Sequence, residues 1–482
     1  MKFYLIIKKI PLSLFFIIIF FILIISIKGE NNNMYSCKIT IKINSSGRQK
    51  FLSSAFENYP NFIIVNNNNR ITNMNSNILN LHEHSNNTIE LFWNNDLTNC
   101  EKIFYGCENI TEVDLSEFNG TNVNEYNNMF EDCISLTSIN ISNLDTSSAK
   151  NMSYMFFNCL NITSLDLSSF NTHLVTNMSS MFSGCESLKF LNISNFDTSK
   201  VINMTKMFND CRSLESLDLS NFYTPSLINM NFIFAECENL TYINLNNFNT
   251  SNVVEMKRVF FNCKSLTYLN LSSFNTSKVD HMVSMFNGCE KLVSLDLSSF
   301  DTKIVRNMNS MFAGCKSITS LNLSHFITSS LNNIEFMFHF NRNLTYLDLS
   351  NFDTSNIKNM TSLFSYCKSL KSIDLSHFNT SSVKSMMQMF QNCASLEYLN
   401  LSNFDTSLVT DMTNMFQNCE NLKYINLKDS NDSNLIQYSD IFKNTPEKMI
   451  FCIDENKNKK LYDIIINNKT NSIINCSNDA YI

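Results

Sequence analysis

The sequence has few of the residues that build tight loops, since its 482 residues include seven glycines, four prolines and one tryptophan. Phosphate-binding loops and dinucleotide fingerprints need several glycines where the backbone approaches the phosphates, so the scarcity of glycine argues against both. The cysteines form no CxxC pair and no short Cys/His pair, which disfavours a zinc site. No Ser/His/Asp set stands out either. We therefore predict a protein that is not an enzyme and holds no cofactor or metal.

Positive charge is also scarce. The formal net charge is −7, and it becomes −11 once the four lysines Lys2, Lys8, Lys9 and Lys28 of the N-terminal segment are removed. A protein that binds nucleic acid normally carries a basic face to neutralise the phosphates. The sequence therefore predicts no nucleic-acid partner.

One spacing dominates the chain, because twelve cysteines fall on a single grid whose step is the interval from Cys107 to Cys133. They are Cys107, Cys133, Cys159, Cys185, Cys211, Cys237, Cys263, Cys289, Cys315, Cys367, Cys393 and Cys419. Asn341 occupies the grid position between Cys315 and Cys367, and no insertion or deletion breaks the count. A fixed period of this length indicates a solenoid in which each repeat adds one supersecondary unit.

Each repeat begins like a strand and continues like a helix. In the repeat from Cys211, the segment Leu217–Ser220 alternates apolar and polar residues, which predicts a strand with one buried face. In the repeat from Cys133, the apolar residues Ala149, Met152, Met155, Phe156 and Cys159 follow a helical spacing. The pattern predicts a parallel sheet with one or two helical turns per repeat on the other side.

The combined pattern LxxLxLSxFxTSxVxxMxxMFxxC resembles the repeat of the BspA-like leucine-rich-repeat surface proteins, a type also abundant as a mycoplasma lipoprotein repeat. This resemblance covers about residues 81–445. It implies an α/β solenoid, with a leucine-rich-repeat-like parallel β-sheet, short helices on the other side and about 13 repeats of about 26 residues. It also implies a protein of the cell surface.

The repeat departs from ordinary leucine-rich repeats at one position. Where those carry a ladder of Asn or Cys, this chain carries phenylalanine in nearly every copy, from Phe118 to Phe404. We expect these rings to pack as a spine. We expect the Thr-Ser pairs that follow, such as Thr276-Ser277 and Thr354-Ser355, to supply the hydrogen bonds that the turn needs.

Four segments follow from these patterns. Residues 1–29 are predicted to be a signal peptide, because three lysines precede the apolar run Ile10–Ile27. The run is long enough to span a bilayer, so an uncleaved anchor is the alternative to cleavage near Gly29. Residues 30–80 are predicted to be an N-terminal cap, 81–445 the solenoid and 446–482 a C-terminal cap.

The caps contain recognisable elements and the cysteines that lie off the grid. We expect strands at Cys37–Ile43, Phe62–Val65 and Met449–Ile453, a turn at Asn66–Asn69, and a helix at Lys459–Asn468. A disulfide between Cys452 and Cys476 is the first candidate pairing, worth on the order of 3 kcal/mol. A pairing of Cys37 with Cys100 is the second.

The cysteines on the grid are predicted to form a buried column of free thiols. Stacked positions hold their Cβ vectors parallel, which keeps neighbouring sulfurs from disulfide geometry. Asn341 then becomes a polar defect, with irregular packing around it. Paired methionines such as Met178 and Met181 are expected in the core, and His325 and His377 on the surface.

The outward side of the predicted strands is the candidate binding face. Counted from the grid residue, position 5 mixes serine with the aromatic residues Phe190, Tyr242, Tyr268, Tyr346, Tyr398 and Tyr424. Exposed tyrosines suit recognition of a protein or a carbohydrate, while cross-strand stabilisation of the sheet is the competing explanation. Position 7 is always Asp or Asn, and Asp348 with Asp374 is its one adjacent pair of aspartates.

N-glycosylation sequons are frequent, and the candidates are Asn44, Asn86, Asn203, Asn359 and Asn468. Further sequons lie on the candidate binding face itself, at Asn140, Asn192, Asn270, Asn322 and Asn400, where glycans would obstruct a ligand. Either these are not modified or that face does not bind.

The favoured function is that of a secreted or cell-surface adhesion glycoprotein that recognises an extracellular protein or carbohydrate. The alternative is a structural spacer in a wall, coat or matrix. Contact with a membrane is expected only through an uncleaved signal segment.

Overall fold

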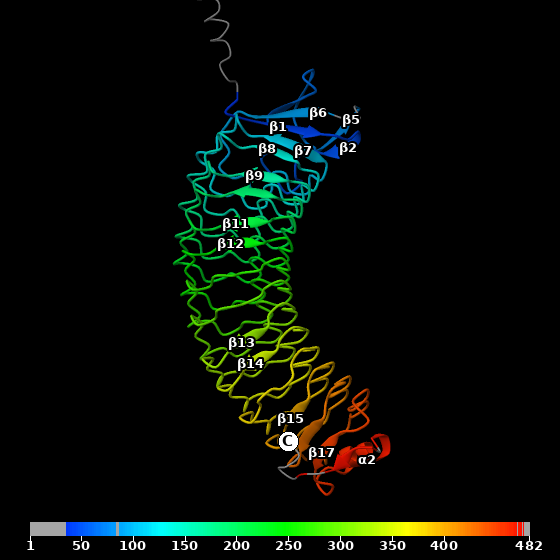
Figure 1. Cartoon of the computed structure of the whole chain (residues 1–482). Helices are drawn as coiled ribbons and strands as arrows, with labels where there is room; N and C mark the ends of the chain where they lie inside the picture. The colour runs from blue at the N-terminus through cyan, green and yellow to red at the C-terminus, as the bar shows by residue number, and fades with distance from the viewer. Residues whose placement is uncertain (1–34, 83–85, 470, 475, 477–482) are drawn as a thin grey trace, which may run out of the picture.

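In the computed structural model, residues 35–82, 86–469, 471–474 and 476 are described, and they wind into a curved rod of stacked coils (Figure 1). An antiparallel sheet lies at the N-terminal end and the helix α2 (Lys459–Asn468) at the other. The predicted signal peptide, residues 1–29, lies outside the described residues. In the part of the chain that is described, no helix has the length and apolar character needed to cross a membrane.

The coils contribute short strands that pair in parallel. They are β7 (Ile110–Asp114), β8 (Ser138–Asn140), β9 (Ser164–Asp166), β10 (Phe190–Asn192), β11 (Ser216–Asp218), β12 (Tyr242–Asn244), β13 (Ser320–Asn322), β14 (Tyr346–Asp348), β15 (Tyr398–Asn400) and β16 (Tyr424–Leu427). Paired residues lie one grid step apart, as Leu217 and Ile243 do. The predicted solenoid of parallel strands is confirmed.

The N-terminal sheet is built around β1 (Cys37–Ile43), which pairs antiparallel with β6 (Asn87–Trp93) on one side and with β7 on the other. Strands β3 (Phe62–Val65) and β4 (Asn69–Thr72) extend it as a hairpin, and β2 (Gly47–Lys50) pairs with β5 (Ile78–Leu81). The strands expected at 37–43 and 62–65 are present. Positive φ angles at Asn66 and Asn67 form the expected turn.

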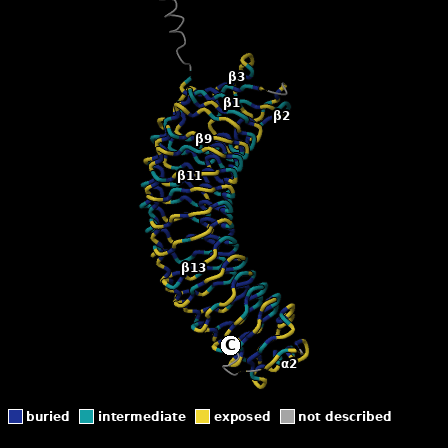
Figure 2. The backbone as a smooth tube through the Cα atoms, in the orientation of Figure 1, coloured by how far each residue is buried: buried dark blue, intermediate teal, exposed yellow. Residues whose placement is uncertain are grey.

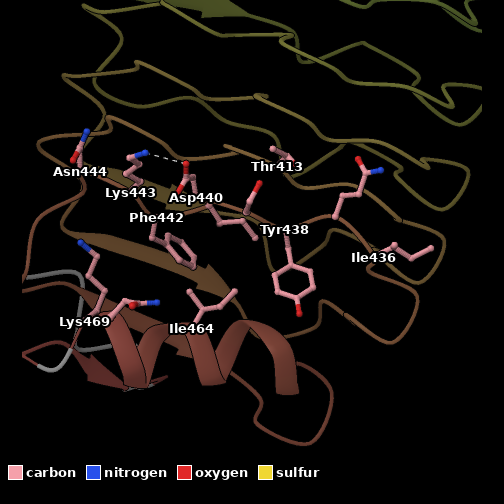
Figure 3. Close-up of a pocket in the computed structure, with 13 residues that line it drawn as sticks. Thr413, Ile436, Tyr438, Asp440, Phe442, Lys443, Asn444, Ile464 and Lys469 are labelled. Carbon is pink, nitrogen blue, oxygen red and sulfur yellow. Dashed lines mark hydrogen bonds and ion pairs between the residues drawn. The ribbon is translucent and has the colours of Figure 1, made fainter.

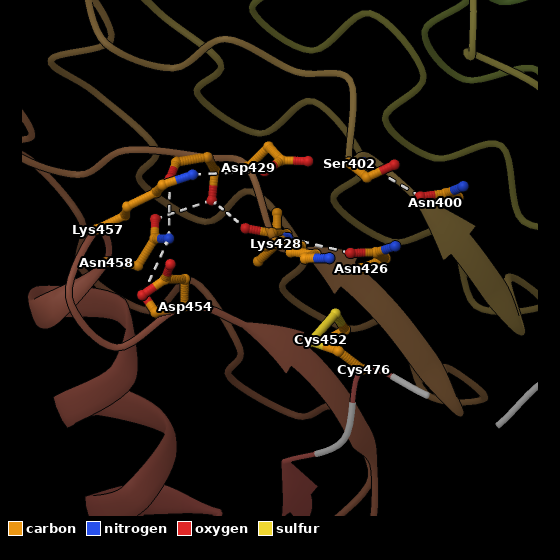
Figure 4. The surroundings of a disulfide bond; sticks show 12 residues. Asn400, Ser402, Asn426, Lys428, Asp429, Cys452, Asp454, Lys457, Asn458 and Cys476 are labelled. Carbon is orange, nitrogen blue, oxygen red and sulfur yellow. Dashed lines mark hydrogen bonds and ion pairs between the residues drawn. A yellow bond between two sulfur atoms is a disulfide. The ribbon is translucent and has the colours of Figure 1, made fainter. Parts of the chain in front are cut away.

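The C-terminal end continues the parallel ladder with β17 (Ile450–Ile453) and β18 (Ile473–Ile474) after β16. Helix α2 has the predicted bounds. It is held because the Leu461 N–H donates to the Asp432 carboxylate (2.9 Å) and the Lys469 ammonium donates to the Thr445 carbonyl (2.8 Å). Cys452 and Cys476 form a disulfide, with Cα atoms 4.6 Å apart (Figure 4).

The second candidate disulfide is wrong, since Cys37 and Cys100 are both free, buried thiols. Cys100 occupies the position that Tyr126 and Met152 hold in the next two coils, so its side chain packs into the core of the solenoid. Cys37 begins strand β1, where it pairs with Trp93 of β6. Packing therefore determines where each thiol lies.

The predicted short helices are also wrong, because the segment before each grid residue is a run of turns. The N–H groups of Tyr126 and Phe130 donate to the carbonyls of Asn151 and Met155 in the next coil, at 3.0 and 2.9 Å. Asn128 between them has a φ of 58°. An α-helix needs each N–H to bond four residues back within the same segment. Apolar spacing alone does not reveal that these bonds run between coils.

Buried residues follow the whole length of the rod (Figure 2). Two columns of stacked phenylalanines lie among them. In the predicted spine, ring centroids are 6.3–6.5 Å apart from Phe170 to Phe274. A second column, from Phe104 to Phe442, has centroids 5.4–5.9 Å apart. The methionines are buried as predicted.

In the coils from Thr146 to Thr406, a buried threonine bonds the backbone of the next coil. The Thr250 hydroxyl donates to the Asn275 carbonyl and accepts from the Asn275 N–H, both at 2.8 Å. Ser277 contributes its backbone instead, because its N–H donates to the Asn275 side chain (3.0 Å). The hydrogen-bonding role predicted for the Thr-Ser pairs therefore belongs to the threonine side chain.

The grid cysteines form the predicted column of buried free thiols. Each thiol after Cys107 also donates to a phenylalanine carbonyl of the preceding coil, as Cys263 does to Phe234 at 3.1 Å. No pattern in the sequence indicates this bond. Burial raises the pKa of Cys237 and Cys315 to about 12.

Asn341 interrupts this column. Its side chain is fully buried, and neither its amide nitrogen nor its amide oxygen has a hydrogen-bond partner among the described residues. In the described coils, parallel bridges join Asn99 stepwise to Asn333 and resume at Asn359, with none between those last two residues. The predicted irregular packing is present, although Phe338 and Phe364 remain stacked beside it.

Replacing Asn341 with cysteine should stabilise the protein. The Asn341→Cys change removes two unsatisfied polar atoms and restores the missing thiol, so the free energy of unfolding should rise by about 1–3 kcal/mol. Denaturant titration measures it. As a control, Cys263→Asn creates the same defect elsewhere and should lower stability. A less stable Asn341→Cys variant would contradict this account.

Alkaline pH should destabilise the fold. An unfolded thiol has a pKa of about 8.5, whereas burial raises the pKa of Cys237 to about 12. The stability that the protonated thiols contribute is therefore complete below about pH 8.5 and is lost as the pH rises toward 12. At pH 10 each such thiol should lower the free energy of unfolding by roughly 2 kcal/mol. Denaturant titrations at pH 8 and 10 should show a smaller fall for Cys237→Val than for the wild type. An equal fall would exclude the thiols as the cause.

Candidate functional site

The strand face carries a set of exposed aromatic rings. The side chains of Phe190, Tyr242, Tyr268, Tyr346 and Tyr398 are 43–65% exposed. Each ring lies at position 5 of its coil, where the alternation of the strand directs the side chain away from the core. The sequence prediction is therefore correct for the exposure of these five residues.

Tyr424 does not belong to this surface, because it is 2% exposed. In the strand pairing it lies between Tyr398 of β15 and Ile450 of β17, so the C-terminal cap covers it. The repeat pattern is the same at this coil as in its neighbours. What distinguishes Tyr424 from the exposed rings is its place in the last coil, beside β17.

Three of these rings lie opposite serine in the strand pairing, although Tyr242 and Tyr268 occupy the same position of consecutive coils. Phe190, Tyr242 and Tyr346 pair with Ser164, Ser216 and Ser320, respectively. Tyr398 pairs with the buried Tyr424. Cross-strand aromatic stabilisation therefore accounts for Tyr398, but it does not account for rings that lie opposite serine.

The Asp and Asn column at position 7 is engaged in local hydrogen bonds. The Asp348 carboxylate accepts from the Ser350 N–H at 3.0 Å, and Asp374 accepts from the Ser376 N–H at 2.9 Å. These N–H groups hold the pKa of both carboxyls below the usual value. Asn140 also donates to Asp114 of the preceding coil (3.0 Å). Stacking and turn formation thus explain much of this column, as predicted.

Two hollows interrupt the strand face, and repeat analysis did not predict them. One, of about 370 Å³, is lined by Tyr268, Asn270 and Asp296. The other, of about 360 Å³, is lined by Tyr346, Asp348, Asp374 and His377. Each lies between a coil with tyrosine at position 5 and a coil with serine there. The polar half-buried His377 was expected to be a surface residue, and it lines the second hollow instead.

A larger cleft of about 910 Å³ lies between the last coil and α2 (Figure 3). Tyr438 and Phe442 come from the coil and Ile464 and Lys469 from the helix end. Helix α2 lies where a further coil would stack, and its rounded surface does not follow the coil closely. The sequence contained no signal for this cleft.

One acidic cluster on the surface has ligand atoms for a cation, but its charges are already compensated. Ligand atoms of Glu255, Asp280 and His281 lie within 4.8 Å of one another. Lys257 forms an ion pair with Glu255 at 2.8 Å, and His281 is paired with Asp280 at 2.7 Å. These contacts describe a surface charge network.

The glycosylation candidates differ in accessibility. Asn44, Asn86 and Asn468 are exposed, whereas Asn203 and Asn359 are half-buried. The side-chain oxygens of the last two accept from the N–H groups of Thr205 and Thr361. Modification at all five remains a prediction.

Comparison with known proteins gives a family. The family described as "Mycoplasma protein of unknown function, DUF285" matches residues 50–166, 157–267, 229–346 and 332–450. No curated protein matches the sequence.

Solved structures of leucine-rich-repeat proteins resemble the chain at low scores. An LRR protein of Leptospira interrogans, LIC12759, has 14% identity and a TM-score of 0.23 and covers 73% of this chain and 92% of its own. The Toll–Spatzle complex of Drosophila has 14% identity and a TM-score of 0.26, with 75% of this chain and 49% of its own covered. At TM-scores this low, the solved structures carry no argument about the fold. The fold is described by the hydrogen bonds between the coils of this chain.

The two kinds of tyrosine should differ in their contribution to stability. Tyr424→Ser leaves a cavity beneath the C-terminal cap and should lower the free energy of unfolding by about 3 kcal/mol or more. Tyr346→Ser, at an exposed ring opposite serine, should change it by about 0.5 kcal/mol or less. Thermal and denaturant unfolding of the two variants measures the contrast. Similar losses in both would show that Tyr346 stabilises the sheet.

Proposed function

The chain belongs to the DUF285 family, described as Mycoplasma protein of unknown function, and we propose that it is a recognition protein that binds its ligand through the strand face. The observation that carries the proposal is the set of exposed rings at Phe190, Tyr242, Tyr268, Tyr346 and Tyr398. Tyrosine gives rigid contact area and a hydroxyl at a small entropic cost, which suits binding.

The position of these rings supports binding over a purely structural role. They project from several coils along one side of a rigid rod, so a ligand that spans coils can contact more than one ring. Rings opposite serine contribute little to the pairing of the strands. The proposed function is non-enzymatic, because exposed aromatic rings supply contact area for binding.

Export to the cell surface is part of the proposal. It rests on the signal-like residues 1–29 and on the resemblance of the repeat to BspA-like surface proteins. The ligand is then an extracellular protein or glycan, and the protein acts in adhesion. Sequons at Asn140, Asn192, Asn270, Asn322 and Asn400 lie on the same face, so this mode of binding requires that they stay unmodified.

A structural spacer is the second candidate function. The observation that favours it is the continuous ladder of backbone hydrogen bonds between coils, which makes the rod stiff whether or not a ligand binds. A spacer needs no exposed aromatic side chains.

Replacement of the exposed tyrosines separates the two functions. Protein and glycan arrays probed with the full chain identify a ligand, and the variant with Tyr242, Tyr268, Tyr346 and Tyr398 all changed to serine is then titrated against it. We expect affinity to fall more than about tenfold, because buried aromatic contacts dominate binding energy.

The control is Tyr223→Ser. Tyr223 is 57% exposed, as Tyr346 is, but it follows the phenylalanine spine at the corner of its coil, outside the strand face. It should leave affinity unchanged. A fourfold variant that binds like the wild type, or a chain that binds nothing on the arrays, would favour the spacer.

A further inference from the structure

Strand β14 (Tyr346–Asp348) pairs with β13 on one side, but within the described residues no strand pairing joins it to residues 372–374 of the next coil. Among the described strands, the ladder is interrupted in the same way between β8 and β9 and between β10 and β11. The hollow of about 360 Å³ lies between β14 and residues 372–374. We name it the Asp348 notch, lined by Tyr346, Asp348, Ser372, Asp374 and His377 among others.

Two carboxylates border the notch. Asp348 and Asp374 are the one pair of aspartates at position 7 of consecutive coils; every other pair contains an asparagine. Like charges directly opposite each other repel, so a cation between the two carboxylates would be stabilised. In the described part of the chain, neither carboxylate forms an ion pair with a lysine, arginine or histidine at 4.0 Å or less.

His377 is a further side chain of the notch, and one of its polar atoms lacks a hydrogen-bond partner among the described residues. It lies at position 10 of its coil, where the side chain normally donates to a carbonyl of the preceding coil. Those that do so are Asn143, Asn195, Asn221, Asn247, Ser273, Ser299, His325, Asn351 and Asn403. His325 Nε2, for example, lies 2.9 Å from the Leu297 carbonyl. The buried Nε2 of His377 has no partner among the described residues.

Tyr346 is the fourth side chain of the notch that bears on its ligand. Tyr346 is 57% exposed at the edge of the notch. An aromatic face attracts a cation, and carboxylates form charge-assisted hydrogen bonds with a guanidinium or an ammonium group. A neutral imidazole nitrogen accepts one more hydrogen bond. All four side chains therefore favour a positively charged group that donates hydrogen bonds.

From this arrangement we infer that the Asp348 notch receives an arginine or lysine side chain of a bound polypeptide. The head group lies between the Asp348 and Asp374 carboxylates, its stem against the Tyr346 ring, and His377 Nε2 accepts a hydrogen bond from it. This inference rests on the proposed recognition function and narrows the ligand to a protein that carries an exposed basic residue.

A bare metal ion fits less well. Within the described residues, the atoms of Asp348, Asp374 and His377 do not belong to a group that converges within 4.8 Å, as those of Glu255, Asp280 and His281 do. A guanidinium spans more widely separated acceptors than one ion does, because its five N–H donors point in several directions.

The second hollow of the strand face serves as an internal control. It has almost the same volume, about 370 Å³, and its own tyrosine, Tyr268. Its position-7 residues are Asn270 and Asp296, so it holds a single carboxylate. Its position-10 residue, Ser299, donates to the Leu271 carbonyl at 3.1 Å. It should therefore not select a cation.

Binding of a defined peptide tests the inference. The probe is a fluorescein-labelled peptide of alternating glycine and arginine, compared with the same peptide containing neutral citrulline, in fluorescence anisotropy with the full chain. We expect the arginine peptide to bind more than tenfold tighter. Asp348→Asn with Asp374→Asn should remove most of this preference. Asparagine retains the oxygen that accepts the turn N–H, as at Asn400 with Ser402, so the fold should be preserved.

The matched control is Asp166→Asn with Asp296→Asn, which removes the same charge from the same column outside the notch. It should change the affinity less than twofold. His377→Asn should weaken binding several-fold, because asparagine at this position can bond the preceding coil, as Asn403 does. Equal losses in both double variants would attribute binding to overall charge and overturn the inference.

A calcium titration gives a further outcome that would overturn it. Calcium binding that requires Asp348 and Asp374, combined with no preference for arginine over citrulline, would make the notch a metal site. The peptide assay does not use the natural ligand, so its failure leaves the tyrosine experiment intact. If the fourfold tyrosine variant binds its ligand like the wild type while the arginine peptide still binds as expected, the wider recognition surface is rejected and the notch is not.

Discussion

Backbone hydrogen bonds between consecutive coils hold the rest of the structure in register. Alternate N–H groups of each turn segment donate to a carbonyl of the next coil, from Cys100 with Glu125 at one end to Asn418 with Lys443 at the other. Because donor and acceptor are always separated by the same interval of sequence, an inserted residue would displace every later donor from its acceptor. The constant length of the repeat is the consequence of this constraint.

Stacking places each side chain beside the equivalent side chain of the next coil. The same residue type therefore repeats along the rod only where two copies of it interact favourably. Phenylalanines stack, threonines both donate and accept, and buried thiols donate to carbonyls. Aspartates repel, which explains why asparagine separates them. The exceptions gather at one coil: Asn341 begins it, the Asn333–Asn359 bridge beside it is missing, and the Asp348 notch lies on its other side. The proposed binding notch therefore borders the coil in which the regular columns are interrupted.

The regular part of the rod supports the proposed binding without taking part in it. Exposed rings that lie opposite serine contribute little to strand pairing, so they are available for contact with a ligand. That surface ends before the last coil, where Tyr424 pairs with Ile450 of β17 and is buried.

The sequence by itself determined the repeat, the buried columns, the strand positions and the exposed side of each strand, because a fixed period with alternating residues leaves one way to bury the apolar set. It also indicated helix Lys459–Asn468. The tertiary structure decided the rest. Spacing of Met152, Met155 and Phe156 is the same for a helix and for a run of turns, and only bonds to the next coil distinguish them. Likewise, the burial of Tyr424 and the unpaired His377 depend on how neighbouring coils and the cap meet, which are contacts between residues far apart in the chain.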